Sequence, residues 1–63
     1  MCLAKVYLRV NSGEELVLED VARMRVAGQM LLLETLFGER REVAASIKEI
    51  DFTSSRITLE ASR

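Results

Sequence analysis

The stretch CLAKVYLRV, from Cys2 to Val10, decides the fold class, because small or apolar side chains recur at every second position. A repeat of two residues is typical of a β-strand with one face turned toward a core. One side of this predicted strand carries Cys2, Ala4, Val6, Leu8 and Val10. Asn11-Ser12-Gly13 follows directly and is typical of a three-residue hairpin loop. The sequence therefore predicts a strand and a tight return at the start of the chain.

Further short strands, separated by turn signals, are predicted along the rest of the chain. They span 15–19, 22–26, 30–37, 41–44, 47–52 and 56–61. The breaks between them carry Asp20, Ala27-Gly28-Gln29, Gly38-Glu39-Arg40 and Thr53-Ser54-Ser55. The most apolar segment, 30–37, is expected at the centre of the sheet. Together these patterns predict an all-β protein, a small curved antiparallel sheet or SH3-like barrel of about six to seven short strands, in one domain over residues 1–63.

The alternation also predicts which side chains share a face of the sheet, because successive residues of a strand point to opposite sides. The pairs expected on a common face are Leu16 with Leu18, Ile50 with Phe52, and Ile57 with Leu59. Ile47 is expected on the face opposite Ile50, and Thr58 is expected to point to solvent.

Two segments leave a helical alternative open. Residues 15–36 contain no proline, and Val17, Val21 and Met24 would share one helical stripe. Residues 42–47 would also suit a single helical turn. Gly28, and the alternation of arginine with apolar residues over 22–26, favour strands instead.

The chain is short enough that we expect it to need support beyond its own core. With 63 residues, it would bury only roughly 60% of the surface that its unfolded form exposes. One cysteine cannot form an internal disulfide, and a chain without histidine offers too few ligands for a structural zinc site. Oligomerisation is therefore the expected support.

Charge and composition argue against several classes of function. Nine Lys and Arg against ten Asp and Glu give a formal net charge of −1, which provides no general attraction to nucleic acid or anionic lipid. The commonest general base, histidine, is absent, and no glycine-rich phosphate loop occurs, so we do not expect an enzyme. The longest aliphatic run, Met30–Leu33, is too short to cross a bilayer, and the N-terminus does not resemble a signal peptide. A cytoplasmic location is expected.

The single cysteine, Cys2, stands next to Met1, and two interpretations of it stay open. A free cysteine packs like a small apolar residue, so Cys2 fits the predicted first strand. A small second residue also normally permits removal of Met1, which would give Cys2 a thiolate and an α-amine as metal donors. Two such N,S chelates, one from each of two chains, would suit square-planar Ni(II).

Four short segments, spread in order over nearly the whole chain, point to a known family. They are Met1–Val6 (MCLAKV), Asp20-Val21, Thr35–Glu39 (TLFGE) and Ile50–Phe52 (IDF). Together they resemble the small nickel-binding accessory proteins of the CooT type, and the Met-Cys start is the most specific element. The resemblance implies a compact all-β protomer that forms a homodimer and binds Ni(II) between chains through Cys2. It also implies a metallochaperone that delivers nickel to a client, carbon monoxide dehydrogenase.

Two other functions stay open from the sequence. The first is a small β-barrel RNA-binding module, with Tyr7 or Phe37 as a stacking surface beside a basic stripe of Arg23, Arg25, Arg40 and Arg41. The nearly neutral overall charge argues against this nucleic-acid function, because phosphate contacts dominate such affinities. The second is a purely structural partner, which predicts a dimer indifferent to nickel and to Cys2.

Overall fold

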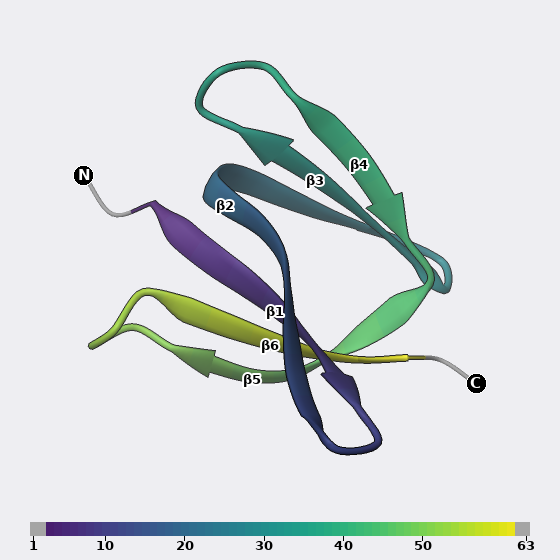
Figure 1. The fold of residues 1–63 in the computed structure, drawn as a ribbon. Coiled ribbons are helices and arrows are strands. Elements are labelled where there is room, and N and C mark those ends of the chain that lie inside the picture. Colours follow the sequence, from purple (N-terminus) through teal and green to yellow (C-terminus); the bar gives the residue numbers. More distant parts are fainter. Residues whose placement is uncertain (1–2, 62–63) are drawn as a thin grey trace.

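The computed structural model describes residues 3–61, which form one six-stranded sheet curled into a half-barrel (Figure 1). The strands are β1 (Ala4–Val10), β2 (Gly13–Ala27), β3 (Met30–Thr35), β4 (Arg40–Val43), β5 (Ala45–Asp51) and β6 (Arg56–Ala61). Their order across the sheet is β4-β3-β2-β1-β6-β5. Residues 3–61 contain no helix, and hence none that could cross a membrane. The all-β prediction is confirmed, and both helical alternatives were wrong.

The sheet is antiparallel except at one pair of strands. β1 and β6 run parallel, with Val6 opposite Ile57 and Leu8 opposite Leu59, whereas the other four pairs are antiparallel. The sequence predicts an antiparallel sheet. A parallel pair needs a long connection between its two strands, and the alternation within one strand cannot reveal which distant strand lies beside it. Here β2 to β5 are that connection, and they bring the last strand beside the first.

A single bent strand, β2, joins the two halves of the sheet. The sequence predicts two strands, 15–19 and 22–26, on either side of Asp20, but β2 is one strand of 15 residues. Asp20 adopts a φ of 58°, in the left-handed region, and the strand changes direction there. Before the bend β2 pairs with β1, Val21 just after the bend pairs with both β1 and β3, and the rest of β2 pairs with β3. Asp20 therefore interrupts the straight run of the strand without ending it.

An extra residue in β2 changes which side chains face the core. Tyr7 lies opposite Leu16, and Val6 lies opposite Leu18, so Val17 is the additional residue of a β-bulge. Because Val6 and Tyr7 point to opposite faces, their partners do so too. Leu18 is accordingly only 7% exposed, whereas Leu16 is 43% exposed. The prediction that these two leucines share a face was wrong.

A second bulge, at Lys48 in β5, has the opposite effect. Ile47 pairs with Leu59, and Ile50 pairs with Ile57, so both isoleucines lie on the inward face. The sequence predicts them on opposite faces, because the extra residue cannot be seen in the alternation. They remain 39% and 43% exposed, since β5 is an edge strand of the sheet.

The core is small and lies inside the curl. Its seven buried apolar side chains are Val6, Leu18, Val21, Leu31, Leu33, Ala45 and Leu59. Thr58 is buried as well, at 5% exposure, although the sequence predicts it in solvent. Its cross-strand neighbours are Tyr7 and Glu49, and a short side chain between two longer ones on an inner strand loses its exposure.

A single residue, Ala44, joins the two strands at opposite edges of the sheet. β4 ends at Val43 and β5 begins at Ala45, yet these strands are the first and the last in the sheet order. Such a short link is possible only because the curl brings the edges toward each other, and β3 contacts β5 across the interior. The hairpin after β1 is similarly tight, since Val10 pairs with Gly13 and leaves a loop of two residues where three were expected.

The left-handed backbone at Asp20 provides a test of the bend. An L side chain in this conformation costs about 1–2 kcal/mol, and a β-branched residue tolerates it worst. Asp20→Val is therefore expected to lower the free energy of unfolding by about 1–2 kcal/mol, whereas Asp20→Gly should leave it unchanged or raise it slightly. Urea titration followed by circular dichroism measures both. Glu19→Val, at the exposed neighbouring position, is the control, and equal losses in the two valine variants would contradict the prediction.

Candidate functional site

Four segments meet at the end of the sheet where the described chain begins (Figure 1). Val21 pairs with both Ala4 and Thr35, which places the bend of β2 between the start of β1 and the end of β3. On the other side of β1, Lys5 lies opposite Arg56, the first residue of β6, so the β5–β6 turn is at this end as well. This end, consisting of residues 3–5, 20–21, 36–39 and 52–55, is named the N-terminal rim.

The predicted metal ligand, Cys2, lies outside the described residues, which begin at Leu3. Within residues 3–61, no three side chains of His, Cys, Asp or Glu are grouped so that they could hold a metal ion. The described residues alone therefore do not fit a metal. A metal site on the N-terminal rim would need donors from residues 1–2, from a second chain, or from both.

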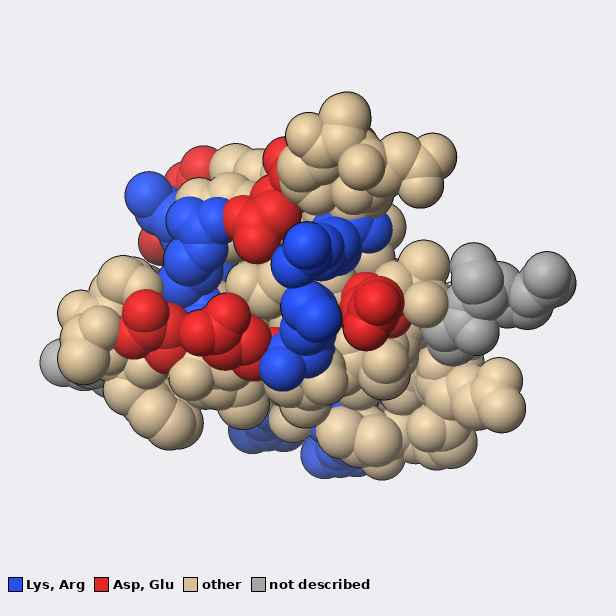
Figure 2. All heavy atoms as spheres, turned by 90° about the horizontal axis from the view of Figure 1, so that it is seen from below, with Lys and Arg blue, Asp and Glu red and all other residues tan. Residues whose placement is uncertain are grey.

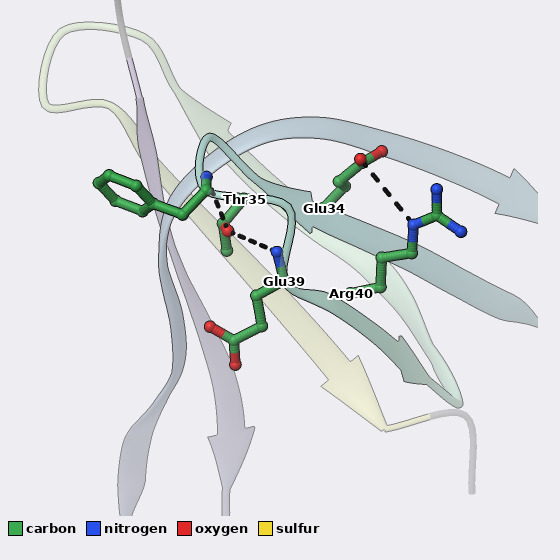
Figure 3. Close-up of polar contacts among 5 residues, drawn as sticks. Glu34, Thr35, Glu39 and Arg40 are labelled. Carbon is green, nitrogen blue, oxygen red and sulfur yellow. Dashed lines mark hydrogen bonds and ion pairs between the residues drawn. The ribbon is translucent and has the colours of Figure 1, made fainter.

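The hydroxyl of Thr35 organises the turn between β3 and β4 (Figure 3). Its Oγ1 accepts hydrogen bonds from the backbone N–H groups of Phe37 at 3.2 Å and of Glu39 at 3.1 Å. The N–H of Thr35 donates to the carbonyl of Glu39 at 2.8 Å, and the N–H of Leu36 donates to the carbonyl of Asp20 at 2.9 Å. Thr35 is only 5% exposed, so a buried side chain orders this turn. The hydrogen bond from Leu36 to Asp20 connects the turn to the bend of β2.

The carboxylate of Asp51 organises the turn between β5 and β6. Its Oδ1 accepts hydrogen bonds from the Thr53 hydroxyl, from the N–H of Thr53 at 2.9 Å, and from the N–H of Ser54 at 3.4 Å. These bonds favour the charged form and lower the pKa of Asp51, the Thr53 hydroxyl contributing most. The N–H of Lys5 donates to the carbonyl of Ser55 at 3.0 Å. This turn is therefore ordered and attached to the first strand.

Each of the two ordered turns carries a phenylalanine that is almost fully exposed. Phe37 is 80% exposed and Phe52 is 85% exposed, and Leu36 beside the first ring is 51% exposed. In the order of the sheet, the two turns lie on either side of the start of β1. Exposed aromatic rings on ordered backbone are typical of a surface that contacts another molecule. The N-terminal rim is therefore the candidate site.

The sequence predicts both rings inside strands, 30–37 and 47–52. The strands instead end at Thr35 and Asp51, because the side chains of these two residues bond to the backbone that follows them. The pattern Asp-x-Thr-Ser at Asp51 is a signal for such a turn and could have located it. The expected central position of 30–37 was also wrong, since β3 lies next to the edge strand and the central strands are β2 and β1.

The arginines of the predicted basic stripe do lie together, at a groove over β2, β3 and β4 of about 240 Å³. They are Arg23 and Arg25 of β2 and Arg40 and Arg41 of β4. Neither Tyr7 nor Phe37 lines this groove. The Tyr7 ring instead stacks with the guanidinium of Arg56, 3.9 Å from the ring centroid. The structure thus brings together the basic half of the expected RNA surface and not its aromatic half.

Comparisons with known proteins agree with this fold. The family model for the CO dehydrogenase accessory protein CooT matches residues 1–60. A crystal structure assigned to CooT from Carboxydothermus hydrogenoformans superposes with a TM-score of 0.90 at 35% identity, covering 98% of this chain and 100% of the other. The uncharacterized protein MJ1551 of Methanocaldococcus jannaschii is 33% identical over 60 residues, or 95% of this chain and 98% of its own.

The role of Thr35 in ordering its turn can be tested by removing the hydroxyl alone. Thr35→Val keeps the shape of the side chain but leaves two backbone donors without their acceptor, so it is expected to lower the free energy of unfolding by about 1–3 kcal/mol. Thr58→Val is the matched control, since Thr58 is also 5% exposed and its hydroxyl forms no hydrogen bond with any residue of 3–61. Chemical denaturation compares the variants, and an equal loss in both would contradict the assigned role.

The carboxyl of Asp51 is expected to titrate below its ordinary pKa, and Thr53→Ala should return the pKa toward that value. Thr53→Ser keeps the hydroxyl and should keep most of the shift. Because the folded-state pKa is the lower one, the hydrogen bonds stabilise the turn above the ordinary pKa, and this stabilisation is lost as pH falls through the folded-state pKa. Titration of the side-chain carboxyl by NMR measures the shift, and an unshifted wild-type carboxyl would refute it.

Proposed function

Because this chain belongs to the CooT family of CO dehydrogenase accessory proteins, we propose that it is a nickel metallochaperone. It binds Ni(II) through Cys2 thiolates at a homodimer interface and delivers the ion to a nickel enzyme such as carbon monoxide dehydrogenase. A member of this family assists an enzyme and is not itself one. The metal, its ligand, the dimer and the client are our proposal.

The N-terminal rim supplies the observation that carries the proposal. The described chain begins there, one residue after Cys2, and Phe37 and Phe52 are exposed there. A two-fold contact between two rims would bury these rings and bring both copies of Cys2 to one interface. Burying a phenylalanine side chain favours association by about 1.5–3 kcal/mol. A chain with a core of only seven buried apolar side chains gains from such support.

The chemistry of Cys2 suits nickel as a transported ion. A thiolate is a soft ligand that prefers nickel, copper or zinc to magnesium or calcium. After removal of Met1, the α-amine of Cys2 would join its sulfur, and both donors release protons when they bind a metal. Two such pairs provide the four donors of a square-planar ion, the geometry that Ni(II) adopts and zinc does not. In this proposal the protein works in the cytoplasm, where the thiol stays reduced.

The RNA-binding alternative has less support. The arginine groove also contains Glu34 and Glu42, which repel phosphate, and none of the described residues that line it is aromatic. A ligand-free structural role differs from the nickel proposal in one respect that can be measured, since its dimer would be indifferent to nickel.

Native mass spectrometry with and without nickel sulfate tests the proposal, because it reports the presence of Met1, the oligomeric state and the bound metal together. The wild-type protein is expected to form a dimer that takes up nickel. Cys2→Ser is expected to lose nickel uptake at this site while its circular dichroism spectrum stays that of the folded protein. Undiminished nickel uptake by this variant, measured by calorimetry, would exclude Cys2 as the ligand.

A second pair of variants separates the interface from the metal. Phe37→Ser combined with Phe52→Ser should raise the dimer dissociation constant at least about tenfold, and nickel should reverse part of that loss by linkage. Leu16→Ser removes an apolar side chain that is 43% exposed and lies outside the N-terminal rim, so it is the matched control. An unchanged dimer in the double variant would exclude the rim as the interface.

A further inference from the structure

The arginine groove differs in charge from the chain as a whole. It has a volume of about 240 Å³, and its charged residues are Arg23, Arg25, Arg40, Arg41, Glu34 and Glu42. Four arginines against two glutamates leave a surplus of two positive charges in a chain whose formal net charge is −1. The groove is therefore a local positive site on a protein that is otherwise slightly acidic.

Strand register explains how these side chains come to lie on one face, with the exception of Arg41, which lies opposite Leu33. Arg23 lies opposite Glu34, which in turn lies opposite Arg40 on the next strand. Two residues further along, Leu32 lies between Arg25 and Glu42 in the same manner. Residues paired across strands share a face of the sheet. The alternate residues of β3, Leu31 and Leu33, are buried on the other face.

The two arginines of β4 are already engaged. Arg40 Nε lies 3.9 Å from a carboxylate oxygen of Glu34, as Figure 3 shows. Arg41 donates a hydrogen bond to the carbonyl of Val17 at 3.3 Å and lies 3.9 Å from the carboxylate of Glu39. Both guanidinium groups therefore already have partners within the protein.

The two arginines of β2 are the available ones. Among residues 3–61, Arg23 and Arg25 form no ion pair and no side-chain hydrogen bond. Both are exposed, and they stand two positions apart on the same face of one strand. Alternate residues of a strand are separated by about 7 Å. An arginine fork matches a carboxylate in a paired, planar geometry.

The surroundings of Arg23 and Arg25 favour a protein over a nucleic acid as the occupant. Glu34 and Glu42 would repel a continuous row of phosphates but can accept donors from a peptide. Half-buried Leu32 also lines the groove and adds an apolar contact for a peptide. The face of the molecule drawn in Figure 2, seen from below the view of Figure 1, likewise carries basic and acidic side chains next to one another. Arginine is also among the residues enriched at protein interfaces.

We propose that this groove docks an extended, acidic segment of a partner protein, in which carboxylates at alternate positions pair with Arg23 and Arg25. The spacing of side chains along an extended segment equals that of the two arginines, because both follow the repeat of a strand. Docking at this groove requires neither nickel nor Cys2, and it therefore stands or fails independently of the metal site.

A fluorescent hexapeptide of alternating glutamate and threonine is the probe, titrated with the full-length protein and followed by fluorescence anisotropy. A peptide of the same composition, with its glutamates at positions 1, 2 and 5 so that no two of them are two residues apart, tests the spacing, and decauridine RNA tests a nucleic-acid occupant. The alternating peptide should bind more tightly than either. Arg23→Gln and Arg25→Gln should each weaken its binding roughly tenfold, the loss expected for a charge-assisted hydrogen bond.

The matched control is Arg9→Gln, which removes one exposed positive charge that does not line the groove. It should leave peptide binding within about twofold of the wild type, since screened charges at a distance contribute little. Lack of binding to the alternating peptide, equal binding of both peptides, or equal losses in all three variants would overturn the proposal. Tighter binding of decauridine that depends on Arg23 and Arg25 would overturn it in favour of RNA.

Discussion

The bend of β2 at Asp20 is the constraint on which the rest of the structure depends. A straight strand of 15 residues could pair with its neighbours only in a nearly flat sheet, and a flat sheet of six strands encloses no core. By turning at Asp20, β2 pairs with β1 before the bend and mainly with β3 after it, and Val21 pairs with both. The sheet then curls far enough for a single residue, Ala44, to join its two edges.

Three of the four segments that carry the family resemblance occupy this bend and the turns around it. Asp20-Val21 is the bend itself, Thr35–Glu39 contains the turn ordered by a buried hydroxyl, and Ile50–Phe52 leads into the turn ordered by Asp51. Hydrogen bonds to the backbone therefore give these segments a structural role that does not involve a metal. They also place the start of the described chain, residues 3–5, between two ordered turns.

Two surfaces of different chemistry result from one small sheet. The N-terminal rim carries two exposed aromatic rings, and burying them would favour association without fixing the orientation of the partner. The arginine groove is charged, and its guanidinium groups would contribute to the orientation and selection of a partner more than to the affinity for it. The two surfaces would therefore recognise partners by different means, the first by apolar contact and the second by charge.

The sequence by itself determined the all-β class and the positions of most turns. Alternation with a period of two is a local property, and the turn glycines Gly28 and Gly38 adopt the left-handed backbone that their positions suggest, with φ of 63° and 91°. The prediction of Cys2 as a metal ligand likewise came from the sequence alone, through its position and the family resemblance. Its structural setting lies outside the described residues.

Only the tertiary structure decided which face of the sheet each side chain occupies, that β1 and β6 form a parallel pair, and that four arginines line one groove. The bulges at Val17 and Lys48 each insert one residue, which reverses the predicted face of the side chains that directly follow it. β1 meets β6 from the far end of the chain, and Arg23 meets Arg40 across β3. Alternation depends on neighbours in the sequence, whereas register depends on which distant strand lies alongside, and no local pattern contains that partner.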